Sequence, residues 1–262
     1  MKAIVLPTAL AAAVQAAQAA GKIMLAHQHR PKRVNSAEAH DIKLALDVRC
    51  QALIEQMLAR RFPQIPVLGE EGSTGDMNAS CRWVIDPIDG TVNYFFGIPH
   101  ACVSIALQQR GEKGFQTVVG VILDPFTDEL WTVTRGGRTR LNGRVVRVSR
   151  RDRIGEAVVA MGFSKSRENL QKSLPHLIRL ARRAKKIRIL GSAALELAYV
   201  ASGRLDVYVE RSINLWDIAA GALMVECAGG ECHLRPAPKG KLRMIADNGR
   251  LRKKLQLGSL LK

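Results

Sequence analysis

Two aspartates, Asp86 and Asp89, stand three positions apart directly after the apolar run Trp83–Ile85. Such a run is typical of a buried strand, so both carboxylates are expected where the strand leaves the core instead of on a solvated face. Buried carboxylates that converge repel one another, and each raises the pKa of the others unless a cation neutralises them. The simpler alternative is that the pair only shapes a turn around Pro87.

Three other segments place carboxylates next to apolar residues, and they hold Asp47, the pair Glu70 and Glu71, and Asp217. Oxygen ligands without a nearby set of His or Cys favour Mg²⁺ or Mn²⁺ over zinc. Taken singly, each segment also has a structural explanation, because an acidic side chain at the start of a helix caps its free N–H groups. The combination of these carboxylates in one chain favours a metal site.

Gly90 and Thr91 follow the two aspartates and supply what a phosphate group would need. Glycine lets the backbone approach a ligand closely, and backbone N–H groups that open a helix can donate to an anion. The Thr91 hydroxyl could orient a water held by a metal. A cation between carboxylates, next to an anion-binding turn, is an arrangement for metal-assisted hydrolysis of a phosphate ester.

An Ala-rich segment at the N-terminus must form the first element that supports these residues. It predicts a helix that begins after Pro7, with a packing side formed by Leu10, Val14, Ala17 and the Ile23–Leu25 cluster. The basic second residue, the apolar run and the Ala-x-Ala triplets also fit a secretory signal, but we favour the structural helix. Gln15 and Gln18 interrupt the apolar stretch, so no membrane span is expected.

The expected elements change along the rest of the chain. A polar connector is expected over 27–41, an amphipathic helix over Ile42–Arg61, and an antiparallel meander over 101–146. After the meander, strands alternate with helices and the chain is expected to close with a basic helical tail. These patterns predict an α+β and α/β fold, with an antiparallel-sheet lobe over residues 1–148 and an α/β lobe over residues 149–262.

The composition fits a folded basic protein. Of the 262 residues 47% are hydrophobic, which argues against a disordered chain. Lys and Arg number 40 against 23 Asp and Glu, and the net charge of +17 would attract phosphate groups, nucleic acid or anionic surfaces. The excess is marked over residues 135–188, which hold 17 Lys or Arg and three Asp or Glu.

Five scattered cysteines do not suit a disulfide framework and indicate a reducing compartment, which we take to be the cytoplasm. Cys227, Cys232 and His233 could form a second kind of metal site. Their spacing is not that of a common zinc site, so small buried thiols are the favoured interpretation.

Four segments together resemble the inositol monophosphatase family. The acidic motif Gly69–Glu71 and the segments Trp83–Leu107 and Leu215–Gly230 resemble its signatures, and Gly191–Glu210 resembles its substrate-side segment. The similarity is greatest to the bacterial extragenic-suppressor type and runs over nearly the whole chain. It implies a layered αβαβα sandwich of the sugar-phosphatase type, a homodimer, and a cytoplasmic Mg²⁺-dependent phosphatase.

The resemblance also implies a ligand set for two or three Mg²⁺ ions, with Mn²⁺ as a possible substitute and Li⁺ and Ca²⁺ as possible inhibitors. Glu70, Asp86 and the Ile88 carbonyl would hold the activating ion, and Asp86, Asp89 and Asp217 would hold a second. The attacking water would lie between Glu70 and Thr91, with Asp47 behind Thr91 to assist proton removal.

The substrate would lie on residues that the resemblance assigns in two groups. Asp89, Gly90 and Thr91 would contact the phosphate end, whereas the hydroxyl groups of the polyol would contact Gly191, Ser192, Ala193, Glu210 and Asp217. Asp217 would also help to protonate the leaving oxygen through a second water.

The chain departs from the family pattern at a few positions. Lys43 and Leu44 replace an apolar residue and a threonine, and Ser36 stands near the usual position of a lysine. These changes concern the third and loosest metal position. Ile189 and Leu190 replace more polar residues before the Gly191 motif.

The leading substrate is inositol-1-phosphate, with a role in phosphatidylinositol phosphate biosynthesis. A related sugar-phosphate or histidinol-phosphate phosphatase stays open, fructose bisphosphate being one possible substrate. A different class of function is a regulatory contact with RNA polymerase or RNA through the basic surface, as bacterial members of the suppressor type are associated with polymerase complexes. A solvated basic surface without a nucleic-acid partner is the simpler interpretation of the charge.

Overall fold

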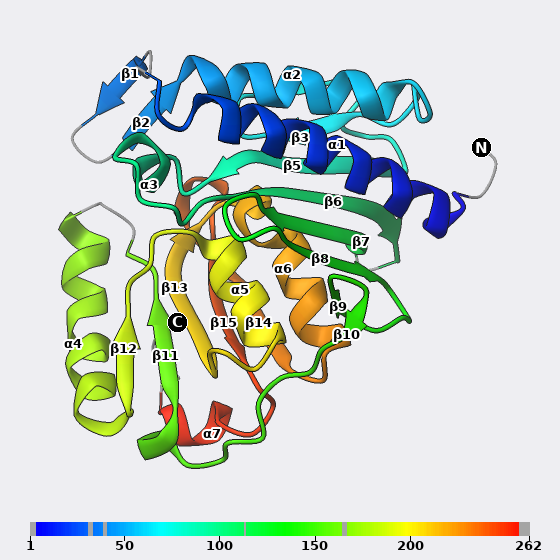
Figure 1. Ribbon diagram of the computed structural model, residues 1–262. Helices are drawn as coiled ribbons and strands as arrows, with labels where there is room; N and C mark the ends of the chain where they lie inside the picture. Colours follow the sequence, from blue (N-terminus) through cyan, green and yellow to red (C-terminus); the bar gives the residue numbers. More distant parts are fainter. Residues whose placement is uncertain (1–3, 31–33, 39–40, 113, 164–166, 257–262) are drawn as a thin grey trace.

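The computed structural model describes residues 4–30, 34–38, 41–112, 114–163 and 167–256 (Figure 1). Two β-sheets alternate with layers of helices, in the order helices, larger sheet, helices, smaller sheet, helix. This confirms the predicted layered αβαβα fold. The division at residue 148 stays a prediction, because the buried cluster between the sheets joins Val84 and Trp131 to Ala160 and Leu223.

The larger sheet has eight strands in the order β10-β9-β8-β7-β6-β5-β3-β4. Their bounds are β3 (Val67–Gly69), β4 (Gly72–Thr74), β5 (Cys81–Asp89), β6 (Cys102–Gly111), β7 (Gly114–Asp124), β8 (Glu129–Thr134), β9 (Arg140–Leu141) and β10 (Arg144–Val145). The strands from β6 to β10 run antiparallel in succession, which confirms the predicted meander. Strand β3 runs parallel to β5, so the carboxyl ends of both strands point to the same end of the sheet.

Helices α1 (Leu6–His27) and α2 (Ala45–Ala59) cover the outer face of this sheet (Figure 1). The buried side of α1 consists mainly of alanines, which allow close packing: a Cβ at Gly21 would lie 2.9 Å from Leu123 Cδ2. The predicted packing side was therefore partly wrong, since Leu25 is 41% exposed. By length and composition α1 could cross a membrane, but 44% of the tested window is buried inside the molecule.

The predicted polar connector before α2 was wrong in part. Residues Val34–Glu38 (β1) and Asp41–Leu44 (β2) form an antiparallel hairpin, and Ile42 belongs to β2 instead of the helix. Both strands are short and carry several polar residues, so the sequence shows no regular apolar alternation there.

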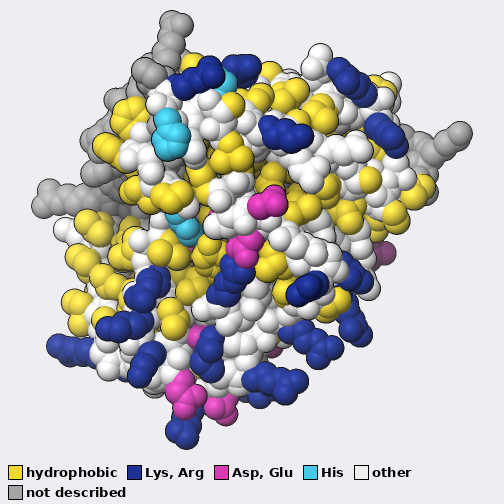
Figure 2. Space-filling model, viewed as in Figure 1, with side chains coloured by type: hydrophobic (Ala, Val, Ile, Leu, Met, Phe, Trp, Pro, Cys, Tyr) yellow, Lys and Arg dark blue, Asp and Glu magenta, His cyan; other side chains and the backbone are white. Residues whose placement is uncertain are grey.

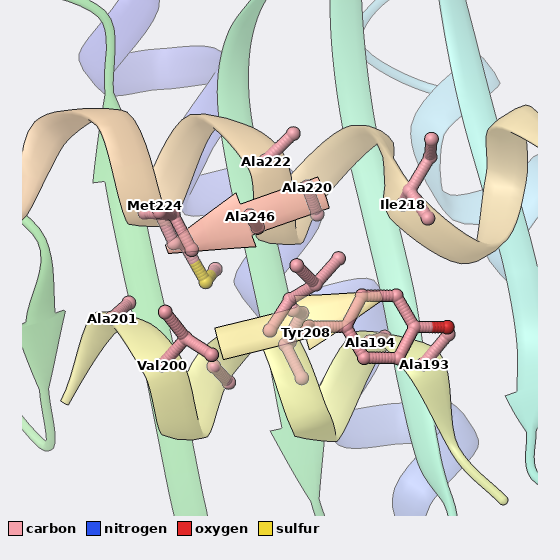
Figure 3. Close-up of a cluster of buried hydrophobic side chains, with 14 of the residues drawn as sticks. Ala193, Ala194, Val200, Ala201, Tyr208, Ile218, Ala220, Ala222, Met224 and Ala246 are labelled. Atoms are coloured by element: carbon pink, nitrogen blue, oxygen red, sulfur yellow. The ribbon is translucent and has the colours of Figure 1, made fainter. Parts of the chain in front are cut away.

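The middle layer consists of α5 (Ala193–Ala201) and α6 (Leu215–Cys227). Figure 3 shows how small side chains of both helices, among them Ala194 and Ala220, allow them to fit between the two sheets. A Cβ at Gly221 would lie 2.5 Å from Leu197 Cβ, so the two helices approach each other closely at this point.

The smaller sheet has the order β12-β11-β13-β15-β14. Its strands are β11 (Val158–Met161), β12 (Lys186–Arg188), β13 (Val207–Ile213), β14 (Glu231–Pro236) and β15 (Leu242–Asp247). Helix α4 (Arg167–Arg183) lies beside β12, as Figure 1 shows, and α7 (Arg252–Leu255) lies near the foot of the sheet. Short 3₁₀ turns occur at Ile154–Glu156 and Pro238–Gly240.

The predicted basic helical tail was wrong over most of its length. Residues 231–236 and 242–247 are paired strands, and between residue 231 and residue 256, where the description of the chain ends, only Arg252–Leu255 forms an α-helix. Basic residues such as Arg235 and Arg243 interrupt the apolar alternation of these strands, whereas Met244, Ile245 and Ala246 are buried.

Candidate active site

Strand β5 ends in a turn whose shape depends on glycine. Gly90 has a φ angle of +93° and precedes helix α3 (Thr91–Phe95). A Cβ at this position would lie 2.9 Å from the His100 carbonyl oxygen, so a side chain would be strained and crowded. The turn is held further by Thr91, whose hydroxyl donates to the Ile88 carbonyl at 2.9 Å.

Asp86, Asp89 and Asp217 converge at this turn. Each offers a carboxylate oxygen, and these oxygens lie within 4.8 Å of one another. Asp86 also accepts the Ile88 N–H at 3.1 Å, and Asp217, in the first turn of α6, accepts the Asn214 N–H at 3.0 Å. The sequence predicted this grouping, although Asp217 is separated from Asp86 by more than a hundred residues.

Burial, followed by the negative charges of Glu70, Asp89 and Asp217, raises the pKa of Asp86 well above its ordinary value. Burial, followed by the negative charges of Asp89 and Glu70, raises the pKa of Asp217 well above its ordinary value. A divalent cation among these oxygens would relieve the repulsion and keep the carboxylates ionised. The donor set, which consists of carboxylates without His or Cys, therefore fits a hard cation such as Mg²⁺ or Mn²⁺.

Asp89 is oriented by donors that lie more than a hundred residues later in the chain. Its Oδ2 accepts the Ser192 hydroxyl at 2.6 Å and the Ala194 N–H at 2.7 Å, and the Cys102 thiol lies 3.8 Å away. Burial raises the pKa of Asp89 to about 6, although the hydrogen bonds from Ser192 and Ala194 act in the opposite direction. The Ser192 hydroxyl, which the resemblance assigned to substrate, thus contacts a carboxylate of the acidic cluster and is buried.

The acidic motif after β3 lies beside the same turn. The Glu70 N–H donates to the Ile85 carbonyl at 3.2 Å, and the charge of Glu70 acts on Asp86. Helix α2 supports this motif through Gln51, whose Oε1 accepts the Glu71 N–H at 2.9 Å. A Cβ at Gly69 would lie 2.4 Å from the Gln51 side chain, so glycine is required for this contact.

Asp47 lies in the first turn of α2 and is buried. Its Oδ2 accepts the N–H of Leu44, which is itself buried at the end of β2, at 2.7 Å. Two further departures from the family pattern, Ser36 and Lys43, have side chains outside the part of the chain that the structure describes.

The substrate-side segment begins at Gly191, which is exposed and has a φ angle of +84°. Ser192 and Ala193 follow at the start of α5 and are buried. Glu210, on β13, accepts a hydrogen bond from the Tyr208 hydroxyl. Gly162 leaves room for this carboxylate, because a Cβ there would overlap Glu210 Oε2.

Two residues outside the predicted site contact the backbone beside Gly191. Asn93 Nδ2 donates to the Leu190 carbonyl at 2.7 Å, and Glu196 Oε1 accepts the Leu190 N–H at 2.9 Å. A signal for Asn93 was present, since it is a polar residue between Val92 and Tyr94 in the turn after the aspartates. Glu196 had a weaker signal, namely a carboxylate within the apolar helix Ala193–Ala201.

The Cys and His alternative gains no support from the geometry. Among the residues that the structure describes, Asp86, Asp89 and Asp217 are the one group of three or more side chains placed to share an ion. The Cys227 thiol lies 3.9 Å from the Thr134 carbonyl, and the Cys232 thiol lies 3.5 Å from the Ala222 carbonyl. Burial raises the pKa of both thiols, which agrees with their interpretation as packed thiols.

Comparisons with known proteins agree with this geometry. A family model described as the inositol monophosphatase family matches residues 6–255. A Xylella fastidiosa protein named Nus factor SuhB is 41% identical over 220 residues, which are 83% of this chain and 78% of that protein. A Rhizobium meliloti protein named inositol-1-monophosphatase is 41% identical over 187 residues, 70% of this chain and 68% of that protein.

Solved structures show the same similarity. The extragenic suppressor protein suhB from Bartonella henselae superposes with a TM-score of 0.88 at 34% identity, covering 97% of this chain and 98% of that chain. An inositol monophosphatase from Anabaena gives a TM-score of 0.84 at 34% identity, covering 95% of this chain and 94% of that chain.

Proposed function

Because the chain belongs to the inositol monophosphatase family, we propose that it is a Mg²⁺-dependent phosphatase of small phosphorylated polyols, with inositol-1-phosphate as the leading substrate. The observation that carries this proposal is the convergence of Asp86, Asp89 and Asp217 within 4.8 Å, directly before the turn at Gly90. Carboxylates in this arrangement are suited to hold cations beside a phosphate ester.

In the proposed site, Glu70, Asp86, Asp89, Asp217 and the Ile88 carbonyl would hold two or three ions. Bound Mg²⁺ would lower the pKa of a water and offset the negative charge on the phosphoryl oxygens. The N–H groups of Gly90 and Thr91 would donate to those oxygens. The Thr91 hydroxyl donates to the Ile88 carbonyl, so its oxygen is left to accept a hydrogen bond from the attacking water and orient it.

Proton movement would use the carboxylates around this turn. Glu70 would accept the proton of the attacking water. Asp47 would be the alternative acceptor, acting through Thr91 once the Thr91 hydroxyl turns from the Ile88 carbonyl towards Asp47. As the bond from phosphorus to the ester oxygen breaks, a water oriented by Asp217 would protonate the leaving alkoxide. Glu210, with the segment Gly191–Ala193, would contact the polyol hydroxyl groups and so align the ester bond for in-line attack.

A panel of phosphate esters, assayed with and without Mg²⁺, tests this function. The panel should include inositol-1-phosphate, fructose bisphosphate and histidinol phosphate, and the highest kcat/KM is expected for inositol-1-phosphate. Mn²⁺ should replace Mg²⁺ in part, and Li⁺ and Ca²⁺ should inhibit. If no ester releases phosphate in a Mg²⁺-dependent way, the proposed enzyme activity is wrong.

We also propose that the protein acts as a cytoplasmic homodimer. Phe96 is 68% exposed, Ile98 is 50% exposed and Ile189 is 58% exposed. The segment with Phe96 and Ile98 lies beside the segment with Ile189. Asn93 donates to the Leu190 carbonyl, and the Ile98 N–H donates to the Asn93 carbonyl. Light scattering should give twice the chain mass of 28.7 kDa, and a monomer at micromolar concentration would contradict the dimer.

A second candidate function is binding of RNA or RNA polymerase through the basic surface. The relative from Xylella fastidiosa that is named a Nus factor favours it, as does the charge of +17. Figure 2 shows Lys and Arg side chains gathered over the region of α4 and β12. The exposed Arg182, Lys186 and Arg188 belong to these two elements.

RNA retention measured over a salt series would test this second function. The triple variant Arg182→Glu, Lys186→Glu, Arg188→Glu should lose retention at physiological salt. A matched variant at exposed positions of the α1 and α2 side, Lys22→Glu, Arg60→Glu, Arg61→Glu, should retain it. Equal loss in both variants would mean that the charge attracts RNA without a defined site.

A further inference from the structure

The peptide groups of Leu190 are held from two directions. The Leu190 N–H donates to Glu196 Oε1 at 2.9 Å, and the Leu190 carbonyl accepts from Asn93 Nδ2 at 2.7 Å. The same Asn93 nitrogen donates to the His100 carbonyl at 2.9 Å, so both of its hydrogens are used. We call these side chains and the Leu190 peptide groups the Leu190 clamp.

Both side chains of the clamp come from elements that also carry residues of the candidate site. Asn93 belongs to α3, which begins at Thr91, directly after the turn at Gly90. Glu196 belongs to α5, whose Ala194 N–H donates to Asp89 Oδ2. The clamp therefore joins the turn at the metal and phosphate end to the segment on the polyol side.

Gly191, the residue after the clamp, lies close to the Asn93 amide. Gly191 has a φ angle of +84°, and a Cβ there would lie 3.1 Å from Asn93 Nδ2. The backbone therefore passes directly over the Asn93 amide. Movement of the amide would release Leu190 and shift the Gly191–Ala193 segment that follows it.

Glu196 is suited to a permanent contact instead of a mobile one. Its side chain is 1% exposed, and burial raises its pKa to about 8. The carboxyl is therefore mainly neutral at pH 7, when one oxygen can still accept the Leu190 N–H. A glutamine side chain has the same shape, is neutral at every pH and keeps an acceptor oxygen.

We propose that Asn93 and Glu196 are positioning residues that hold the Gly191–Ala193 segment against the phosphate-binding turn and thereby set the affinity of the enzyme for polyol hydroxyl groups. This inference rests on the proposed function. Neither side chain needs to touch the substrate, because both act through the backbone of Leu190.

Kinetics with two substrates test the proposed effect on the affinity for polyol hydroxyl groups. Inositol-1-phosphate carries the polyol hydroxyl groups, whereas p-nitrophenyl phosphate has none. Asn93→Ala should raise KM for inositol-1-phosphate about tenfold, the effect of losing the hydrogen bond to the Leu190 carbonyl, while kcat changes less than about threefold. The ratio of kcat/KM for inositol-1-phosphate to that for p-nitrophenyl phosphate should fall by about the same factor.

Glu196 offers a matched pair of variants. Glu196→Gln keeps the acceptor and should leave the specificity ratio within about twofold of the wild type, whereas Glu196→Ala should lower it about tenfold. Thermal unfolding shows whether each variant is folded at the assay temperature. An unchanged specificity ratio in folded Asn93→Ala would overturn the proposal, and so would a glutamine variant as impaired as the alanine variant.

Hydrogen exchange of the Leu190 amide tests the clamp without substrate, metal or activity. The amide should be protected in the wild type and in Glu196→Gln, and should exchange at least about tenfold faster in Glu196→Ala. Fast exchange in the wild type would contradict the clamp. If the wild type hydrolyses no ester, the proposed function fails, whereas exchange still decides whether Glu196 holds Leu190.

Discussion

At the scale of single residues, the candidate site is formed by carboxylates that burial makes costly to ionise. Asp89 illustrates the balance, because burial raises its pKa to about 6 while Ser192 and Ala194 donate hydrogen bonds to its Oδ2. These donors fix the orientation of the carboxylate and leave its negative charge available for a cation. Removal of that charge should therefore affect metal binding more than folding.

Asp89→Asn is expected to lower kcat/KM at least about a hundredfold, since it removes charge from the proposed metal site. The free energy of unfolding without metal should not fall by more than about 1 kcal/mol, as an amide in this place removes repulsion with Asp86 and Asp217. Mg²⁺ should raise the melting temperature of the wild type and raise it less in the variant. Unchanged turnover in Asp89→Asn would refute the metal assignment.

Glu196 should make the free energy of unfolding depend measurably on pH. Its pKa rises from an ordinary value of 4.5 to about 8 in the folded state, so the unfolded chain releases this proton first. The stabilising effect of the neutral carboxyl is complete below pH 4.5 and is lost as the pH rises towards about 8. Denaturant unfolding at pH 5 and pH 8 measures the change.

The matched comparison is Glu196→Gln, which does not titrate. Between pH 5 and pH 8 the wild type should lose on the order of 3 kcal/mol relative to this variant. Parallel stability curves for the two proteins would mean that Glu196 is already ionised in the folded state at neutral pH.

At the scale of elements, close packing of helices brings the two halves of the site together. Helices α5 and α6 lie between the sheets, where α5 presents Ala194 to Asp89 and α6 presents Asp217 in its first turn. Small residues allow this arrangement, since Gly221 on α6 leaves space for Leu197 on α5. The spacing of these helices thus determines the distance of Asp217 from the two aspartates of β5.

Gly221→Ala should force α5 and α6 apart, because the new Cβ would lie 2.5 Å from Leu197 Cβ. We expect a loss of about 1 to 3 kcal/mol in the free energy of unfolding and a lower affinity for Mg²⁺. Denaturant unfolding and Mg²⁺ titration of the same samples measure both effects. A more stable variant would mean that the helix propensity of alanine outweighs the crowding.

At the scale of the whole molecule, a continuous core joins the two sheets. The buried cluster between them includes Trp131 of the larger sheet, Leu223 of α6 and Tyr208 of the smaller sheet. The Trp131 indole N–H donates to the Ser202 hydroxyl, which follows α5, so a polar contact also joins the larger sheet to the middle layer. The core of the larger sheet is therefore incomplete without helices α5 and α6, which come from the second half of the chain.

The chain should therefore unfold in one cooperative transition. Urea unfolding followed by far-ultraviolet circular dichroism and by tryptophan fluorescence should give coincident curves. Circular dichroism reports the secondary structure of the whole chain, whereas Trp83 and Trp131 report the larger sheet and Trp216 reports α6, and one core joins these parts. Two separated transitions would favour independent lobes at the predicted boundary of 148.

The sequence pattern by itself determined the α+β and α/β class, the meander after Ala101, and the carboxylates of the β5 turn, whereas the layered arrangement was implied by the family resemblance. These features depend on local spacing: alternating apolar residues, helix periodicity, and acidic residues directly after apolar runs. It did not predict β14 and β15, because the charges of Arg235 and Arg243 mask strands whose burial is decided by pairing with β13.

The tertiary structure alone decided which distant groups meet. It placed Ser192 on Asp89, alanines instead of Leu25 on the buried side of α1, and Asn93 on Leu190 across 97 residues of chain. Contacts of this kind depend on how closely helices and sheets can approach, and that distance is set by the volumes of side chains from several elements at once. For this reason the acidic motif could be read from one segment, whereas the groups that orient it could not.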